Sequence, residues 1–285
     1  MSTLALLLVL GGAFAHATWN LAAKGGASSG PPFVWVCSLV SVIVLAPFAV
    51  FTLATTDVLW GPMLLGGGIS GILHAGYFLL LQRGYLAGDI SLVYPMARGS
   101  GPLLSVIFAV VLFGERPSLL ALLGAAAVIA GVAVIGLAGA RLQRINKPAI
   151  GFGLATGVII AGYTLWDAFA VTELAASPIV LSWLSSVVEV MVISPLLAGK
   201  WDEVRAVWAG SRRQAMIVGI GSPVAYILVL FAMQIAPVSL VAPGREFSVV
   251  LVSLAGWLWL KEPHPQKRLA GAVVVLCGVI LIAFG

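Results

Sequence analysis

The sequence predicts an all-α integral membrane protein with ten transmembrane helices, arranged as two inverted five-helix repeats. Composition is the first observation, because 61% of the 285 residues are hydrophobic and only 9% are charged. That charged share is about a third of the usual value for a soluble domain, which leaves too little polar surface to meet water. The other two observations are an internal repeat and the number of apolar runs in each half.

The repeat relates the two halves of the chain. Segment 91–95 (SLVYP) returns as segment 239–243 (SLVAP), 148 residues later. Further pairs at an offset of 147 residues are Trp19 with Trp166, Asn20 with Asp167, Glu115 with Glu262, Gly124 with Gly271 and Gly131 with Gly278. We therefore expect a first repeat over 1–140, a basic linker over 141–148 and a second repeat over 149–285.

Each half contains five apolar runs long enough to cross about 30 Å of hydrocarbon. The ten predicted spans are 3–22, 33–54, 62–82, 90–112, 118–138, 149–170, 178–198, 214–234, 238–259 and 267–284. The longest polar connection is 200–213. Because five is odd, the second repeat enters the bilayer from the opposite side to the first, so the repeat is inverted.

Basic residues of the connections fall on one side of the membrane. Twelve lie in the connections after the odd-numbered spans: Lys24, Arg83, Arg141, Arg144, Lys147, Lys200, Arg205, Arg212, Arg213, Lys261, Lys267 and Arg268. The other side carries only Arg116. This asymmetry predicts a multi-pass membrane protein with the basic side cytoplasmic and both termini exterior. It accounts for the formal charge of +5 without a nucleic-acid partner.

Several of these features resemble the drug/metabolite transporter superfamily, and within it the ten-helix proteins built from two EamA-type repeats. The resemblance covers nearly the whole chain. It rests on Trp19-Asn20 followed by Lys24, the 92–102 stretch, the 114–117 turn (GERP) and the glycine spacing of 124–131. It implies a secondary transporter of small polar metabolites in a bacterial inner membrane, an exporter or exchanger, that works by alternating access without a cofactor. It also implies cytoplasmic termini, which is opposite to the orientation that the charge asymmetry predicts.

Polar side chains inside the first and sixth spans form matching faces. The members are His16, Trp19 and Asn20, and their counterparts Tyr163, Trp166 and Asp167. Residues at i, i+3 and i+4 share one face of a helix, and we expect the repeat axis to place the two faces opposite each other. The tryptophans are interpreted as an aromatic wall of a substrate cavity, or as interfacial or core residues. Asp167 is either a proton or amine site or a hydrogen-bond acceptor in helix packing.

Helix-breaking residues recur in the fourth and ninth spans. They are Pro95, Gly99 and Pro102 in the first repeat, and Pro243 and Gly244 in the second. A proline removes one amide donor and blocks the carbonyl group four residues earlier. Such backbone is tolerated at membrane depth where protein or a water-filled cavity satisfies it, so the two spans are expected to wall a binding site and to gate it. A plain kink is the alternative.

The same two spans carry ionisable residues: Tyr94 and Arg98 in the first repeat, and Arg245 and Glu246 in the second. Arg98 corresponds to Glu246 at the repeat offset. We hypothesise that these two pair across the axis in one conformation and separate in another, which frees an arginine to hold an anionic substrate group. A static buried ion pair is the alternative.

The remaining candidates are less specific. His74 and Tyr77 lie three residues apart and are expected to face the same cavity, while Glu189 lies in the seventh span with no partner that the sequence identifies. No histidines and cysteines stand at metal-ligand spacing, so no metal or cofactor is expected. Glu115 and Glu262 are expected to cap the helices that follow them. Glycines 124, 131, 271 and 278 let helices approach closely or form a dimer surface.

Together these features favour a transporter over an enzyme. Arginine and acidic residues in one cavity suit a zwitterion, such as an amino acid or an aminophosphonate. The partners expected are the small-molecule substrate and the lipid bilayer, with the chain a monomer or homodimer. The alternatives are transport of cationic drugs or other metabolites, a channel, or an intramembrane enzyme, although the serines of the repeat have no histidine at helical spacing.

Overall fold

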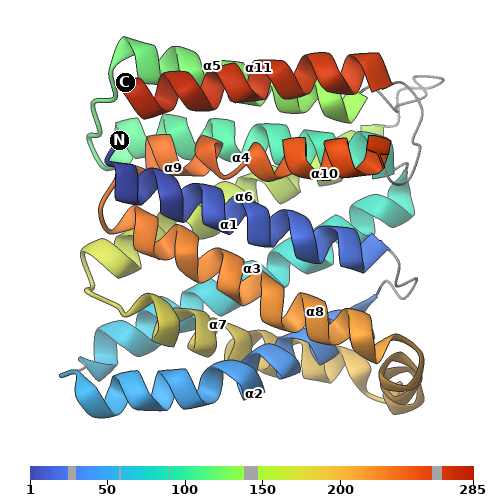
Figure 1. The fold of residues 1–285 in the computed structure, drawn as a ribbon. Helices are drawn as coiled ribbons and strands as arrows, with labels where there is room; N and C mark the ends of the chain where they lie inside the picture. Colours follow the sequence, from blue (N-terminus) through green and yellow to red (C-terminus); the bar gives the residue numbers. More distant parts are fainter. Residues whose placement is uncertain (25–29, 58, 89, 138–146, 259–264) are drawn as a thin grey trace.

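The computed structural model describes residues 1–285 except 25–29, 58, 89, 138–146 and 259–264. Within the described residues the chain is helical throughout (Figure 1). The elements are α1 (Thr3–Lys24), α2 (Pro31–Thr55), α3 (Trp60–Ala87), α4 (Ile90–Leu112), α5 (Leu119–Leu137), α6 (Lys147–Thr172), α7 (Pro178–Ile193), the 3-10 helix η1 (Ser194–Leu197), α8 (Trp201–Met233), α9 (Val238–Gly244), α10 (Phe247–Leu258) and α11 (Pro265–Phe284).

The helices confirm the ten predicted spans. Seven stretches are long and apolar enough to cross a membrane, and three shorter apolar helices, 96–112, 119–135 and 269–284, account for the remaining spans. The polar connection 200–213 differs from its expected form, because α8 already begins at Trp201. Its first turns carry exposed charged residues, and the helix is kinked at Ser211 (φ −129°, ψ 20°) before the apolar part starts. Most of the predicted linker, 141–146, lies outside the described residues.

The predicted break in the ninth span is present. α9 ends at Gly244 and α10 begins at Phe247, so Arg245 and Glu246 lie between two helices. The backbone there makes short-range bonds, with the Glu246 amide donating to the Pro243 carbonyl at 3.0 Å. The matching break in the fourth span is not observed, because α4 is helical from Ile90 to Leu112. A proline in a transmembrane helix need not end it when neighbouring helices satisfy the carbonyl group that it frees.

The packing follows the repeat. α1 packs against α8, and its counterpart α6 packs against α3, so the first helix of each repeat contacts the third helix of the other. α2 packs against its counterpart α7, α4 against α9, and α5 against α11. α1 starts at the end of the molecule where both termini lie, and α6 starts at the opposite end (Figure 1). The Met1 amine donates to the Ala283 carbonyl at 3.4 Å, which ties the two termini together.

Glycines bring α5 and α11 into close contact. A Cβ atom added to Gly124 would lie 2.7 Å from the carbonyl oxygen of Gly278, and one added to Gly271 would lie 2.8 Å from that of Gly131. Side chains at these positions would therefore push the helices apart. Of the two roles expected for these glycines, the structure shows close approach within the chain.

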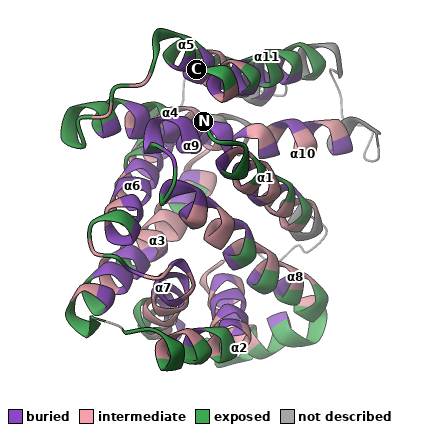
Figure 2. Ribbon diagram, turned by 60° about the vertical axis from the view of Figure 1, so that its left-hand side comes forward, coloured by how far each residue is buried: buried purple, intermediate pink, exposed green. Residues whose placement is uncertain are grey.

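The end of the molecule that carries the termini is tightly closed. Every residue of α9 is buried, and the largest apolar cluster joins it to Ala5 and Val9 of α1, Val180 and Leu181 of α7, and neighbouring residues of α6 and α8. Figure 2 shows the buried residues of α9 beside the outward-facing, exposed surfaces of α5 and α11. Exposed apolar side chains on the outer helices suit contact with lipid.

Glu115 connects the two repeats at this closed end. Its carboxylate accepts hydrogen bonds from the backbone amides of Val238 at 2.8 Å and Ser239 at 2.9 Å. These are the first amides of α9, which have no partner within the helix, and Pro237 before them has no side-chain acceptor. The prediction that Glu115 caps the helix after it is therefore wrong. It caps a helix of the other repeat, while its counterpart Glu262 lies outside the described residues.

Candidate functional site

A cavity of about 230 Å³ lies inside the bundle, lined by α1, α2, α3, α4, α6, α7, α8, α10 and the α9–α10 break. On α1 the lining runs from Gly12 to Trp19, in the second half of the helix, and on α2 from Phe33 to Ser41, in the first half. α1 begins and α2 ends at the end that carries the termini. The cavity is therefore displaced toward the opposite end, away from the closed apolar cluster.

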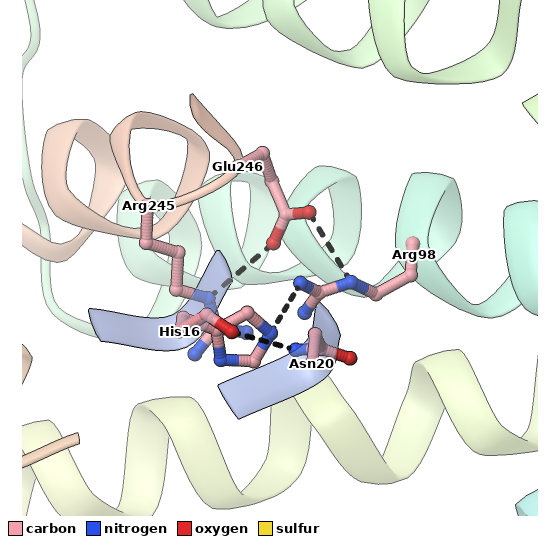
Figure 3. A network of polar contacts seen from close by, with 5 residues as sticks. All are labelled: His16, Asn20, Arg98, Arg245 and Glu246. Carbon is pink, nitrogen blue, oxygen red and sulfur yellow. Dashed lines mark hydrogen bonds and ion pairs between the residues drawn. The ribbon is translucent and has the colours of Figure 1, made fainter. Parts of the chain in front are cut away.

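A cluster of two arginines and one glutamate forms one side of the cavity (Figure 3). Glu246 Oε2 lies 3.4 Å from Arg98 Nε, and its Oε1 lies 3.5 Å from Arg245 Nε. All three side chains are buried, with Glu246 only 1% exposed. The predicted pairing of Arg98 with Glu246 is confirmed. Two positive charges face one negative charge, so this side has a net charge of +1, and both arginines line the cavity.

The arrangement of His16 completes this side. Arg98 Nη2 lies 3.0 Å from His16 Nε2, and Asn20 Nδ2 donates to the His16 carbonyl at 2.9 Å (Figure 3). An arginine nitrogen is always a donor, so His16 Nε2 accepts and the imidazole is neutral. Trp19 lies edge-on to the His16 ring at 4.8 Å and also lines the cavity. His16 thus orients the Arg98 guanidinium without adding charge.

Aromatic rings form a second part of the wall. Tyr163 on α6 stacks on His74 at 4.2 Å and lies edge-on to Tyr77 at 6.0 Å. The Arg245 guanidinium carbon lies 5.9 Å above the Tyr163 ring, a cation–π contact that links the aromatic wall to the arginines. His74 and Tyr77, which the sequence predicts to share a cavity, both line it.

Hydroxyl groups and a carboxylate form a third part, on α2 and α7. Its lining residues are Ser38, Ser41, Ser182, Ser185, Ser186 and Glu189. The Ser38 hydroxyl donates to Glu189 Oε2 at 2.7 Å, which gives Glu189 the partner that the sequence does not identify. Sequence reasoning missed these serines. The signal was available, because 182, 185, 186 and 189 follow the spacing of one helix face.

Asp167 lies behind this wall. Its side chain is 0% exposed and accepts a hydrogen bond from the Tyr226 hydroxyl at 2.5 Å. Tyr226 lines the cavity, whereas Asp167 does not, so Tyr226 separates the carboxylate from the open space. Tyr226 is a further site residue that sequence reasoning missed, since no repeat partner or motif marks it. Asn20 donates within α1 and Asp167 accepts from α8, so within the described residues no hydrogen bond joins these two residues.

The predicted residues therefore separate into three groups. Those that line the cavity are His16, Trp19, His74, Tyr77, Arg98, Tyr163 and Arg245. Those that hold a lining residue in place are Asn20, Glu246 and Asp167. Those placed elsewhere are Tyr94, whose ring lies 5.8 Å from the Arg98 guanidinium carbon, and Trp166, whose indole donates to the Gly66 carbonyl at 2.9 Å.

The break residues lie beside the site. Pro243 and Gly244 are buried at the end of α9, and a Cβ atom on Gly244 would lie 3.1 Å from Val9. Gly99 and Pro102 lie on α4 next to Arg98, and they do not line the cavity. Among the described residues, no three histidine, cysteine or acidic side chains are grouped to hold a metal ion.

Apolar spans in two interlocked repeats around a central polar cavity define a multi-pass membrane protein of the transporter class. The model of the EamA-like transporter family matches residues 3–137 and again residues 147–284. The chain therefore belongs to this family, within the drug/metabolite transporter superfamily, and is a transporter.

Two further comparisons give a curated relative and a solved structure of similar fold. A "Probable terminal-alkyne amino-acid exporter" of Streptantibioticus cattleyicolor is 28% identical over 260 residues, covering 87% of this chain and 80% of the relative. A solved crystal structure superposes with a TM-score of 0.73 at 18% sequence identity, covering 100% of this chain and 98% of that one. The structural likeness shows the fold.

Proposed function

We propose that the protein exports an amino acid or a similar zwitterion across a bacterial inner membrane by alternating access. One observation carries the proposal: the cavity has a side with a net positive charge, at Arg98 and Arg245, and a separate wall that carries the Glu189 carboxylate. A zwitterion has the complementary pair of charges. The named relative, an amino-acid exporter, supports the same substrate class.

The geometry suggests how such a substrate would bind. Its carboxylate would accept hydrogen bonds from the two arginines, whose fork of donors matches a carboxylate. Its ammonium group would lie toward the serines and Glu189, and an apolar side chain would contact Trp19 or the Tyr163 ring. The acid of the site is then Glu189, which lines the cavity, while Asp167 acts through Tyr226.

Alternating access is supported by the asymmetry of the structure. The end that carries the termini is closed by the apolar cluster and by the Glu115 contact with α9, and the cavity extends toward the other end. By the positive-inside rule that other end is cytoplasmic, so this conformation would load substrate from the cytoplasm. The short-range backbone at Arg245 and Glu246 would serve as a hinge between α9 and α10.

The test is counterflow in liposomes that contain the purified protein. Labelled propargylglycine, alanine, threonine and 2-aminoethylphosphonate would be offered to vesicles preloaded with the unlabelled compound. Arg98→Lys keeps the charge but loses the fork that contacts Glu246 and His16, so we expect exchange to fall about tenfold or more. Arg116→Lys, at an exposed position of the connection after α4, is the matched control and should behave as wild type.

Two results would overturn the proposal. The first is no counterflow of any compound in the panel by folded wild-type protein, which would point to cationic drugs or other metabolites. The second is counterflow that Arg98→Lys and Arg116→Lys leave equally unchanged, because the arginine side of the cavity would then take no part in substrate binding.

A further inference from the structure

Glu189 is a buried carboxylate that faces the cavity without a permanent cation beside it. Its side chain is 8% exposed, and its hydrogen bond comes from the neutral Ser38 hydroxyl at 2.7 Å. Within the part of the chain that the structure describes, no ion pair joins Glu189 to a lysine or arginine. An ionised carboxylate at membrane depth is costly, so a neutralising group is favoured there.

The titratable groups around Glu189 come from α2, α3, α6 and α8. Cys37 on α2, His74 on α3 and Asp167 on α6 interact with it or with each other electrostatically, and Tyr226 on α8 lies on the same cavity wall. The short η1 helix contributes no titratable side chain. Of these four groups His74 alone can carry a positive charge.

His74 makes its closest polar and ring contacts with other residues than Glu189. Its Nδ1 lies 2.9 Å from the Ser70 carbonyl, which accepts only from a protonated nitrogen, and its ring stacks on Tyr163. These contacts hold the ring at Ser70 and Tyr163, and within the described residues no ion pair joins it to Glu189. Charge compensation of Glu189 is therefore left to whatever enters the cavity.

We propose that Glu189 is the site where a proton and the ammonium group of the substrate exchange, so that one proton enters for each substrate molecule exported. The inference rests on the proposed function. When the ammonium arrives, the O–H bond at the Glu189 carboxyl breaks and its proton passes to cavity water. After the substrate leaves, a proton from water forms that bond again. Nothing is oxidised or reduced. The Glu189 carboxylate is neutralised by the ammonium group while substrate is exported and by a proton while the empty transporter returns.

The proposal predicts a definite accumulation ratio. Vesicles one pH unit more acidic inside, with the membrane potential clamped at zero by valinomycin and equal potassium, would be offered labelled propargylglycine. One-for-one exchange with protons drives the substrate toward the acidic compartment to an inside-to-outside ratio of about 10, because one pH unit corresponds to a tenfold difference in proton activity. Glu189→Gln should bring this ratio to about 1, since the amide cannot release a proton.

Three companion variants make the readout specific. Glu189→Asp restores a carboxylate and should restore accumulation. Glu203→Gln makes the same chemical change at an exposed position of α8 and should accumulate as wild type. Asp167→Asn removes a second buried carboxylate. Loss of accumulation in this variant, with accumulation kept in Glu189→Gln, would overturn the assignment.

Counterflow at equal pH separates this inference from the proposed function. Wild type that exchanges substrate but does not accumulate it under the pH gradient, or accumulates it in the alkaline compartment, overturns the inference and leaves the transport function standing. Accumulation that persists in Glu189→Gln overturns it as well. Glu189→Gln could be inactive in both assays. In that case accumulation by Glu189→Asp, together with proton movement in wild type, supports the inference, and the absence of either overturns it. Absence of counterflow in wild type refutes the proposed function itself.

Discussion

Glu115 is expected to hold the terminal end of the transporter closed. It spans the two repeats, because it follows α4 and accepts both first amides of α9. Glu115→Ala removes the only side-chain acceptor that the structure shows at these amides among the described residues. Capping residues contribute about 0.5–2 kcal/mol, and a carboxylate at a helix N-terminus adds a favourable interaction with the helix dipole. A loss of about 2 kcal/mol corresponds to a shift of about thirtyfold toward conformations in which α9 is released.

The shift can be measured by accessibility of a cysteine at the closed end. Ala236→Cys, placed just before α9 in a background with Cys37 and Cys277 changed to serine, would react with a membrane-impermeant maleimide. Position 236 is 9% exposed and belongs to the apolar cluster. We expect Glu115→Ala to raise the labelling rate by about one order of magnitude or more. Glu115→Gln keeps one oxygen acceptor and should give an intermediate rate.

A thermal unfolding measurement completes this test. The same lost hydrogen bonds should lower the unfolding temperature of Glu115→Ala relative to wild type. If Glu115→Ala leaves both the labelling rate and the unfolding temperature unchanged, the carboxylate does not hold α9, and the reasoning from its two hydrogen bonds is refuted.

Two more predictions concern packing and a buried polar pair. Gly278→Ala should destabilise the fold by about 1–3 kcal/mol, since its Cβ atom would lie 2.6 Å from the Gly124 carbonyl oxygen. Gly68→Ala has no atom within 4 Å of the added Cβ and should change stability by less than about 1 kcal/mol, so equal thermal shifts for the two would contradict the close-packing argument. Tyr226→Phe deprives Asp167 of its donor and should cost about 1–3 kcal/mol in thermal unfolding. Recovery of stability in the double variant with Asp167→Asn would confirm the pair, and its absence would count against it.

Much of the fold follows from the sequence, because the hydropathy of a span and the internal repeat are each averaged over many residues. Ten apolar runs and a repeat offset of 147 or 148 residues locate the spans to within a few residues at most ends. The details that fail are local. The first turns of α8 are polar, so the sequence predicts a connection there, although a helix outside the hydrocarbon region needs no apolar run. α4 remains one helix despite its prolines, since the tolerance of a proline depends on neighbours that the sequence does not place.

The site was predicted in part for the same reason. Arginine, histidine and tryptophan inside apolar spans are rare enough to be noticed one at a time. Serines are common in helices, so the hydroxyl wall on α7 is visible only as a spacing pattern around Glu189. Ser38 is the repeat counterpart of Ser185, which would have placed α2 and α7 on the same wall. Tyr226 has no repeat partner and belongs to no spacing pattern. Its hydrogen bond to Asp167 depends on how α8 is rotated against α6.

The geometry of the repeat explains which predicted pairs formed. Counterpart residues can meet only where counterpart helices touch, which the structure shows for α2 with α7, α4 with α9 and α5 with α11. Arg98 on α4 and Glu246 beside α9 are such a pair, and they are in contact. The glycines of α5 and α11 meet crosswise, because Gly124 lies against Gly278 and Gly131 against Gly271 rather than against their own counterparts. α1 packs instead on α8, and α6 on α3 and α4. Asn20 therefore binds within α1 while Asp167 binds Tyr226 of α8, although the two occupy the same place in their repeats.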